Sequence, residues 1–202
     1  MSFDIDVSRR LGEAEIALSF RAEGGLTALF GPSGSGKTSA LNMIAGLLRP
    51  DRGHIVVAGE TLFGDGVDLP AERRHAGYVF QDGRLFPHLR VRANLRYGRR
   101  GPGWIAFDDV VDLLGLGALL DRWPRTLSGG EIQRVAIGRA LLSSPRFLLM
   151  DEPLASLDGA RANEIMGMIA RVRDELKLPI LYVSHNRAEV DRLATQIVPV
   201  RR

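Results

Sequence analysis

The chain has 202 residues and no cysteine, and its 27 Lys and Arg against 24 Asp and Glu give a net charge of +3. This composition suits one soluble globular domain and excludes disulfides and thiolate metal sites. The start MSFDIDVSRR lacks the features of a secretory signal, and no apolar stretch reaches the roughly 18 to 20 residues that span a bilayer. We therefore expect a cytoplasmic protein that reaches a membrane only through a partner.

The N-terminal third predicts strands around a glycine-rich loop. The short segments FDIDV, EIALSF and LTALF read as strands, and the last stops directly at Gly31. From Lys37 to Leu48 the apolar residues recur at helical spacing, and RPDRG at 49–53 is expected to end the helix. A strand, a glycine loop and a helix stand in the order that a P-loop requires.

The middle of the chain changes from strands to helices. HIVVAGETLF at 54–63 reads as a hairpin strand, and AGYVFQ at 76–81 reads as a further short strand. The strand signal then disappears over residues 84–144, where 107–123 and 130–145 carry helical periodicity. We interpret this region as a helical insert.

Strand character returns in RFLLMDE at 146–152 and PILYVSH at 179–185, with a crossover helix expected over 159–177. Continuous apolar strands of this kind lie inside a parallel sheet that is covered on both faces. The predicted fold class is α/β, a P-loop core with a mostly parallel sheet, an N-terminal antiparallel β region and a helical insert.

The domain organisation is expected to be simple, because no repeat, low-complexity tract or linker interrupts the chain. Residues 1–202 are predicted to form one domain. Its nucleotide-binding core would comprise 1–83 and 145–202, and its helical subdomain 84–144.

GPSGSGKT at 31–38 fits the P-loop pattern GxxxxGK[ST] in full. Its glycines let backbone N–H groups surround phosphates at a helix N-terminus, Lys37 reaches the β- and γ-phosphates, and the Thr38 hydroxyl binds Mg²⁺. The alternative is a chance glycine loop before a helix. The residues expected to contact the nucleotide here are Gly31, Pro32, Ser33, Gly34, Ser35, Gly36, Lys37, Thr38 and Ser39.

Two adjacent carboxylates end the strand FLLMDE. Asp151 is predicted to hold Mg²⁺ together with Thr38, and Glu152 to orient and deprotonate a water molecule. Gln81 and His185 also follow strands, so both are candidates to contact the same metal, water or γ-phosphate. The alternative is that the carboxylates cap the following turn, PLASLD.

A second glycine-rich turn, TLSGGE at 126–131, begins a predicted helix. Ser128, Gly129 and Gly130 present free N–H groups and the positive end of the helix dipole, which suits an anion. The alternative is that Ser128 is only an N-cap, with Glu131 completing a capping box. The two interpretations are compatible, because both use the same helix end.

GPSGSGKT, Gln81, LSGGE, LLMDE, SLD and His185, in this order, resemble the nucleotide-binding subunit of an ABC transporter. The segment at 73–98 is similar to the importer type, and most of all to the ATPase of molybdate importers. The resemblance implies ATP hydrolysis with Mg²⁺ in a head-to-tail homodimer. There Ser128, Gly129, Gly130 and Glu131 of one copy close over the ATP of the other, and Asp158 lines the interface.

The resemblance also implies partners and a location. Such subunits bind membrane permeases at the cytoplasmic face of the inner membrane, and a periplasmic binding protein takes part indirectly; no nucleic acid is expected. The candidate permease contacts are Phe86, Pro87, His88 and Leu89, with ordinary packing of the insert as the alternative. Six arginines, at 84, 90, 92, 96, 99 and 100, face a partner, anionic lipid or solvent.

Two features depart from the family pattern. The family places an aromatic residue that stacks on adenine before the P-loop strands, whereas SRRLGEAE at 8–15 has none, so that Leu11 or nearby apolar atoms would have to serve. Molybdate-type subunits also commonly carry a β-rich regulatory domain, and this sequence ends at VPVRR. We expect no such C-terminal domain here.

Three other classes of function are compatible with parts of the sequence. A soluble ABC ATPase acting on nucleic acid would suit the pI of about 9.8, but it predicts a coiled coil, a tandem ATPase or a basic arm. An importer of sulfate, another anion or a sugar is a further alternative. A regulatory module without hydrolysis would be expected to have a damaged P-loop or to lack Glu152.

Overall fold

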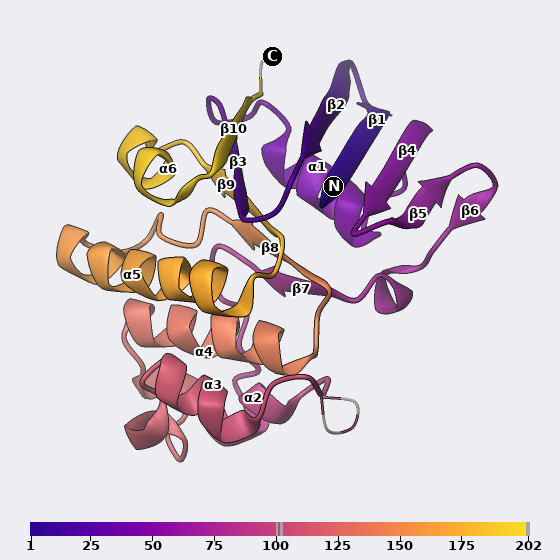
Figure 1. Ribbon diagram of the computed structural model, residues 1–202. Coiled ribbons are helices and arrows are strands. Elements are labelled where there is room, and N and C mark those ends of the chain that lie inside the picture. The colour runs from indigo at the N-terminus through magenta and orange to yellow at the C-terminus, as the bar shows by residue number, and fades with distance from the viewer. Residues whose placement is uncertain (100, 102, 201–202) are drawn as a thin grey trace.

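The computed structural model describes residues 1–99, 101 and 103–200, which form two five-stranded sheets. Arg100, the last arginine of the predicted basic segment, lies outside the described residues. The antiparallel sheet has the order β2-β1-β4-β5-β6, and the parallel sheet has the order β10-β3-β9-β8-β7. Figure 1 shows the antiparallel sheet beside α1 and the longer helices on the far side of the parallel sheet. This architecture confirms the predicted α/β class.

The antiparallel sheet contains the N-terminal hairpin and the strands after α1. In β1 the side chains of Phe3, Ile5 and Val7 are buried at alternate positions, as in a sheet with one covered face. The strands are β1 (Phe3–Leu11), β2 (Ala14–Ala22), β4 (Arg52–Val57), β5 (Glu60–Gly64) and β6 (Val67–Asp68).

The parallel sheet positions the candidate site. Its strands are β3 (Leu26–Phe30), β7 (Ala76–Val79), β8 (Phe147–Asp151), β9 (Ile180–Ser184) and β10 (Gln196–Pro199). Every residue of β8 and β9 is buried, since both faces of the sheet are covered. Parallel strands bring their carboxyl ends to one edge, so the segments after β3, β8 and β9 meet there.

The helices divide between the two faces of the parallel sheet. One hydrophobic cluster joins α1 (Lys37–Ala45) and the antiparallel sheet to one face, and a second joins α4 (Gly129–Leu142), α5 (Gly159–Leu176) and α6 (Arg187–Leu193) to the other. The shorter helices α2 (Val91–Arg96) and α3 (Phe107–Leu113) pack against α4. No helix in the described part of the chain is both long and apolar enough to cross a membrane.

The predicted insert at 84–144 holds α2, α3, α4 and two 3-10 helices, η2 (Gly117–Leu119) and η3 (Pro124–Thr126), and no strand among its described residues. The helix expected over 107–123 was too long. It breaks after Leu113, since Gly115 adopts a positive φ of 60°, and only a 3-10 turn follows. The division into core and helical subdomain stays a prediction.

The first helix also ends earlier than predicted. It stops at Ala45 and not at RPDRG, because Gly46 takes a left-handed φ of 79° and closes the helix C-terminus. A Cβ at Gly46 would lie 2.6 Å from Nε of Arg74, so the position requires glycine. The C-terminal elements α6 and β10 were not predicted. Both are short, and β10 is an edge strand whose pattern is irregular.

Arg74 stabilises this helix end from inside the protein. Its side chain is 1% exposed, and its guanidinium donates to the carbonyl oxygens of Met43 at 2.8 Å, Ile44 at 3.1 Å and Leu69 at 2.7 Å. Met43 and Ile44 belong to the last turn of α1, where carbonyl oxygens lack partners within the helix.

The Arg74→Ala variant is expected to lose about 3 kcal/mol of stability, because it opens a cavity and leaves buried carbonyls without donors. Urea denaturation measures this loss. The control is Arg73→Ala, which removes an exposed arginine from the neighbouring 3-10 turn η1 (Ala71–Arg73). Equal stability of the two variants would contradict the role of Arg74 in stabilising the end of α1.

Candidate active site

The glycine-rich loop joins β3 to α1 and presents little side-chain bulk. Gly36 has a φ of 87°, and a Cβ there would lie 2.9 Å from Cγ2 of Ile16 on β2. Ser35 has its Oγ buried without a hydrogen-bond partner among the described residues. A buried hydroxyl that lacks a partner inside a glycine loop fits a bound anion better than a purely structural turn.

Lys37 lies at the centre of this loop. It is 4% exposed, and its ammonium donates to the carbonyl oxygens of Gly31 at 2.9 Å and Pro32 at 2.7 Å. Burial lowers the pKa of Lys37, while Glu152 and Asp151 act in the opposite direction. The cation is therefore held inside the loop, within electrostatic reach of both acids.

Thr38 and Asp151 lie together, as the sequence predicted for a metal site. The Thr38 hydroxyl donates to Oδ1 of Asp151 at 3.0 Å. Burial raises the pKa of Asp151, and the charge of Glu152 raises it further, although Thr38 and Lys37 oppose this. A hydroxyl beside a partly desolvated carboxylate offers the hard oxygen ligands that Mg²⁺ prefers, and a divalent charge would offset the desolvation. The residues present therefore fit Mg²⁺.

Lys37 and Thr38 line a cavity of about 800 Å³, which is large enough for a nucleotide. Gln81 and Glu152 line it from the strand ends, opposite the loop. Its lining residues are Ala14, Glu15, Ile16, Ala17, Ser33, Gly34, Ser35, Gly36, Lys37, Thr38, Ser39, Gln81 and Glu152. Leu11, which was expected to contact adenine, is not among them, because it is 38% exposed at the tip of β1. The apolar wall of the cavity comes from Ile16 and Ala17 of β2.

Glu152 and His185 are brought into direct contact. Oε2 of Glu152 lies 3.0 Å from Nδ1 of His185. Glu152 has a positive φ of 43°, an uncommon conformation for a non-glycine residue that is concentrated at functional sites. It also lines a second cavity of about 330 Å³, together with His185 and Asn186. Glu152 therefore stands between the two cavities.

Glu189 supports the turn that carries His185, and sequence reasoning missed it. Its side chain is 8% exposed, and Oε2 accepts hydrogen bonds from Tyr182 Oη at 2.9 Å and Ser184 Oγ at 2.8 Å. Ser184 Oγ in turn accepts from the backbone N–H of Asn186 at 2.9 Å. The available signal was an acidic residue shortly after the apolar strand β9. It was missed because α6, the helix that carries Glu189, was not predicted.

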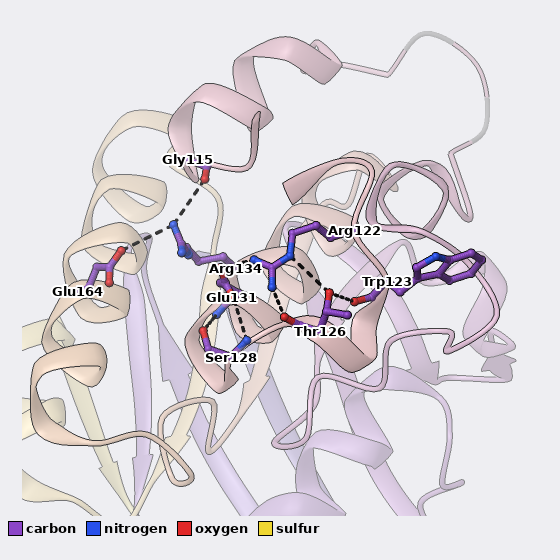
Figure 2. Close-up of polar contacts among 8 residues, drawn as sticks. All are labelled: Gly115, Arg122, Trp123, Thr126, Ser128, Glu131, Arg134 and Glu164. Atoms are coloured by element: carbon purple, nitrogen blue, oxygen red, sulfur yellow. Dashed lines mark hydrogen bonds and ion pairs between the residues drawn. The ribbon is translucent and has the colours of Figure 1, made fainter. Parts of the chain in front are cut away.

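The second glycine turn forms the N-terminus of α4, and both parts of the capping box are present. Ser128 Oγ accepts from the N–H of Glu131 at 3.3 Å, and Glu131 Oε2 accepts from the N–H of Ser128 at 2.6 Å (Figure 2). Ser128 and Gly129 are partly or fully exposed. None of residues 128–131 lines the cavity around the P-loop of the same chain.

Gln133, on the next turn of α4, ties this helix to the loop after β7. It is 2% exposed, and its Nε2 donates to the carbonyl oxygen of Gln81 at 2.7 Å. Arg139 donates to the carbonyl oxygens of Gly83 at 2.9 Å and Arg84 at 2.8 Å. Sequence reasoning assigned neither residue a role, since polar residues on a predicted helix read as surface positions.

Asp158 and the predicted permease contacts at 86–89 lie at or near the surface. Asp158 is exposed and caps α5, where its side chain accepts from the N–H of Arg161 at 3.0 Å. The ring of Phe86 packs at a tilt of 41° against the ring of Tyr97, with 4.0 Å between the ring centroids, and lines a groove of about 400 Å³. Pro87 and His88 are exposed beside it, and Leu89 is half-buried.

Residues 15–155 match the family model described as ABC transporter. The chain belongs to the ABC transporter family. The relatives of this ABC chain include the molybdenum import ATP-binding protein ModC of Mesorhizobium japonicum, 58% identical over 98% of the chain and 55% of the relative. The protein of the same name from Rhodospirillum rubrum is 59% identical over 96% of the chain and 54% of the relative. The chain thus spans about half the length of the curated relatives it matches.

A solved structure is similar over nearly the whole ABC chain. It is the ATP-binding cassette MJ0796, described as a dimeric post-hydrolysis state bound to ADP and Pi. The TM-score is 0.79 with 25% sequence identity, over 99% of this chain and 94% of the other. The family predicted from the six short motifs and the fold class predicted from the strand and helix patterns are both confirmed.

Proposed function

We propose that this chain is the ATP-hydrolysing subunit of an ABC importer and that it energises the uptake of an oxyanion, molybdate, through a membrane permease. The observation that carries the proposal is the convergence of Lys37, the Thr38–Asp151 pair and the Glu152–His185 pair at one edge of the parallel sheet. A phosphate loop, a hydroxyl–carboxylate pair that fits a metal and a base at the same sheet edge are the components of phosphoryl transfer.

In the proposed mechanism, the P-loop backbone and Lys37 bind the phosphates of ATP. Thr38, Asp151 and Gln81 would hold Mg²⁺, which neutralises phosphate charge when it is bound. Glu152 accepts a proton from the attacking water, and His185 keeps the carboxylate in place through its 3.0 Å contact. No residue outside the predicted set is required for these roles.

A head-to-tail homodimer would complete the site. Ser128 is half-buried and Gly129 exposed at the start of α4, whereas Gly130 is buried, and none of the three lines the cavity of its own chain. We therefore expect this helix end to meet the nucleotide of a second copy through Ser128 and Gly129 first. Asp158 would lie at the same interface. The similar ATP-binding cassette is described as a dimer, which supports the pairing of two copies. In the proposed cycle, binding of two ATP molecules closes the pair and hydrolysis reopens it.

The partners and the location follow from the same proposal. The subunit would sit at the cytoplasmic face of the inner membrane, on permease subunits that receive cargo from a periplasmic binding protein. Phe86, Pro87, His88 and Leu89 would contact the permease beside the groove over α4. We also propose a single ATPase domain with a core of 1–83 and 145–202 and a helical subdomain of 84–144.

The cargo is tested by uptake. Vesicles that contain the permease and this subunit should take up molybdate in an ATP-dependent way, and sulfate much less. The Glu152→Gln subunit in the same vesicles is the matched control and should give no ATP-dependent uptake. Equal stimulation by molybdate, tungstate and sulfate would contradict the choice of molybdate and leave a general oxyanion importer.

A further inference from the structure

Arg122, in the bend between η2 and η3, contacts the chain on both sides of Ser128 (Figure 2). Before Ser128, its guanidinium donates to the carbonyl oxygen of Thr126, and its Nε lies 3.4 Å from the Thr126 hydroxyl. After Ser128, its Nη1 donates to Oε1 of Glu131 at 3.0 Å. The Thr126 hydroxyl is itself fixed, because it donates to the carbonyl oxygen of Trp123 at 2.9 Å. One guanidinium therefore binds both ends of the glycine turn, at Thr126 and at Glu131.

Glu131 is a fixed anion in the first turn of α4. One carboxylate oxygen accepts from the N–H of Ser128 and the other from Arg122, and the side chain is 19% exposed. The hydrogen bond from Ser128, with smaller effects of the charges of Arg122 and Arg134, holds the pKa of Glu131 below its usual range. The carboxylate is therefore charged near neutral pH.

This charge opposes the proposed role of the helix end. The positive end of the helix dipole stabilises a carboxylate in the first turn. The same carboxylate repels a phosphate that approaches the N–H groups at this helix end. Arg134, one turn further along α4, points away from Ser128, with Nη1 3.5 Å from the carbonyl oxygen of Gly115 and 3.7 Å from Oε1 of Glu164 (Figure 2). Arg122 is the cation in direct contact with Glu131.

We infer that Arg122 is a positioning residue of the second glycine turn: it fixes the capped geometry of Ser128 and neutralises Glu131, so that the start of α4 accepts the γ-phosphate bound by a second copy. The inference rests on the proposed head-to-tail dimer. Arg122 itself need not touch the nucleotide, because it acts through the two residues that it clamps.

The test uses the Glu152→Gln chain and records its molecular mass by light scattering as Mg·ATP is titrated. Adding Arg122→Ala should raise the Mg·ATP concentration for half-dimerisation about tenfold, since each interface loses one compensating charge. Adding Glu131→Gln to that variant should restore the concentration to within about threefold, because the amide oxygen still accepts from Ser128 without a charge. A merely structural role would show no such rescue.

Two further variants separate charge from folding. Arg125 is an exposed arginine of η3 that has no ion pair within the described ranges. Arg125→Ala should change the Mg·ATP concentration for half-dimerisation less than about twofold. Arg122→Lys keeps the charge and should stay within about threefold of the parent. Thermal unfolding without nucleotide confirms that each variant is folded.

The outcomes are distinguishable. Three results would each overturn the role of Arg122 and leave the dimer intact. They are an Arg122→Ala variant that dimerises at the parent's Mg·ATP concentration, a failed rescue by Glu131→Gln, and a folded Arg122→Lys variant that needs as much Mg·ATP as Arg122→Ala. A parent protein that binds nucleotide and stays monomeric at every concentration would overturn the proposed dimer and the role of Arg122 together.

Discussion

The Glu152→Gln variant is expected to turn over ATP about 10²- to 10⁴-fold more slowly than the parent, while its affinity for Mg·ATP changes little. Glutamine has the same shape and can still accept a hydrogen bond from His185, but it cannot take a proton from water. The contact of 3.0 Å between Glu152 and His185 should therefore survive the substitution while the chemistry does not.

Single-turnover hydrolysis and calorimetric binding measure the two effects separately. The matched control is Glu175→Gln, which neutralises an exposed glutamate on α5 that pairs only with Arg171 among the described residues. The control should keep the parent rate. A Glu152→Gln protein that retained more than a tenth of that rate would exclude Glu152 as the base.

The Lys37→Ala variant is expected to bind Mg·ATP at least about 30-fold more weakly, because it removes the one buried cation inside the phosphate loop. Its hydrolysis should fall further, since phosphate charge also develops during the reaction. The other lysine of the sequence, Lys177, is exposed at the end of α5 and supplies the control, Lys177→Ala.

Binding of a fluorescent ATP analogue measures this loss. The unfolding midpoint without nucleotide should change little in Lys37→Ala, since the loss of the hydrogen bonds to Gly31 and Pro32 is offset by the removal of a charge whose burial is unfavourable. An affinity within threefold of the parent would mean that the backbone alone binds the phosphates and that Lys37 is structural.

The central strands and the P-loop could be predicted because local chemistry determines them. β8 and β9 are continuous apolar runs, and the glycine pattern admits few other conformations. The contact between Glu152 and His185 was foreseeable in outline, because both follow neighbouring parallel strands. Helix ends were less predictable. Gly46 closes α1 with the help of Arg74, which lies 28 residues further along the chain.

The parts of the site that were missed depend on partners distant in sequence. Gln133 reads as a polar surface residue of α4, and only the fold places it against the carbonyl oxygen of Gln81. Glu189 reads as an ordinary helix residue until Tyr182 and Ser184 are seen to donate to it. Arg122 looks like one of many arginines, and the capping box at Ser128 gives it a specific partner.

The most direct test of the central claim is the mass of the Glu152→Gln chain in solution, with and without Mg·ATP. The account predicts a monomer that becomes a dimer only with nucleotide, and that stays monomeric when Ser128 is also replaced by arginine, whose side chain would fill the space of the second copy's phosphate. Dimerisation that persists in the Ser128→Arg chain, or a parent that binds Mg·ATP and never dimerises, would contradict the claim that the second glycine turn closes over a neighbour's nucleotide.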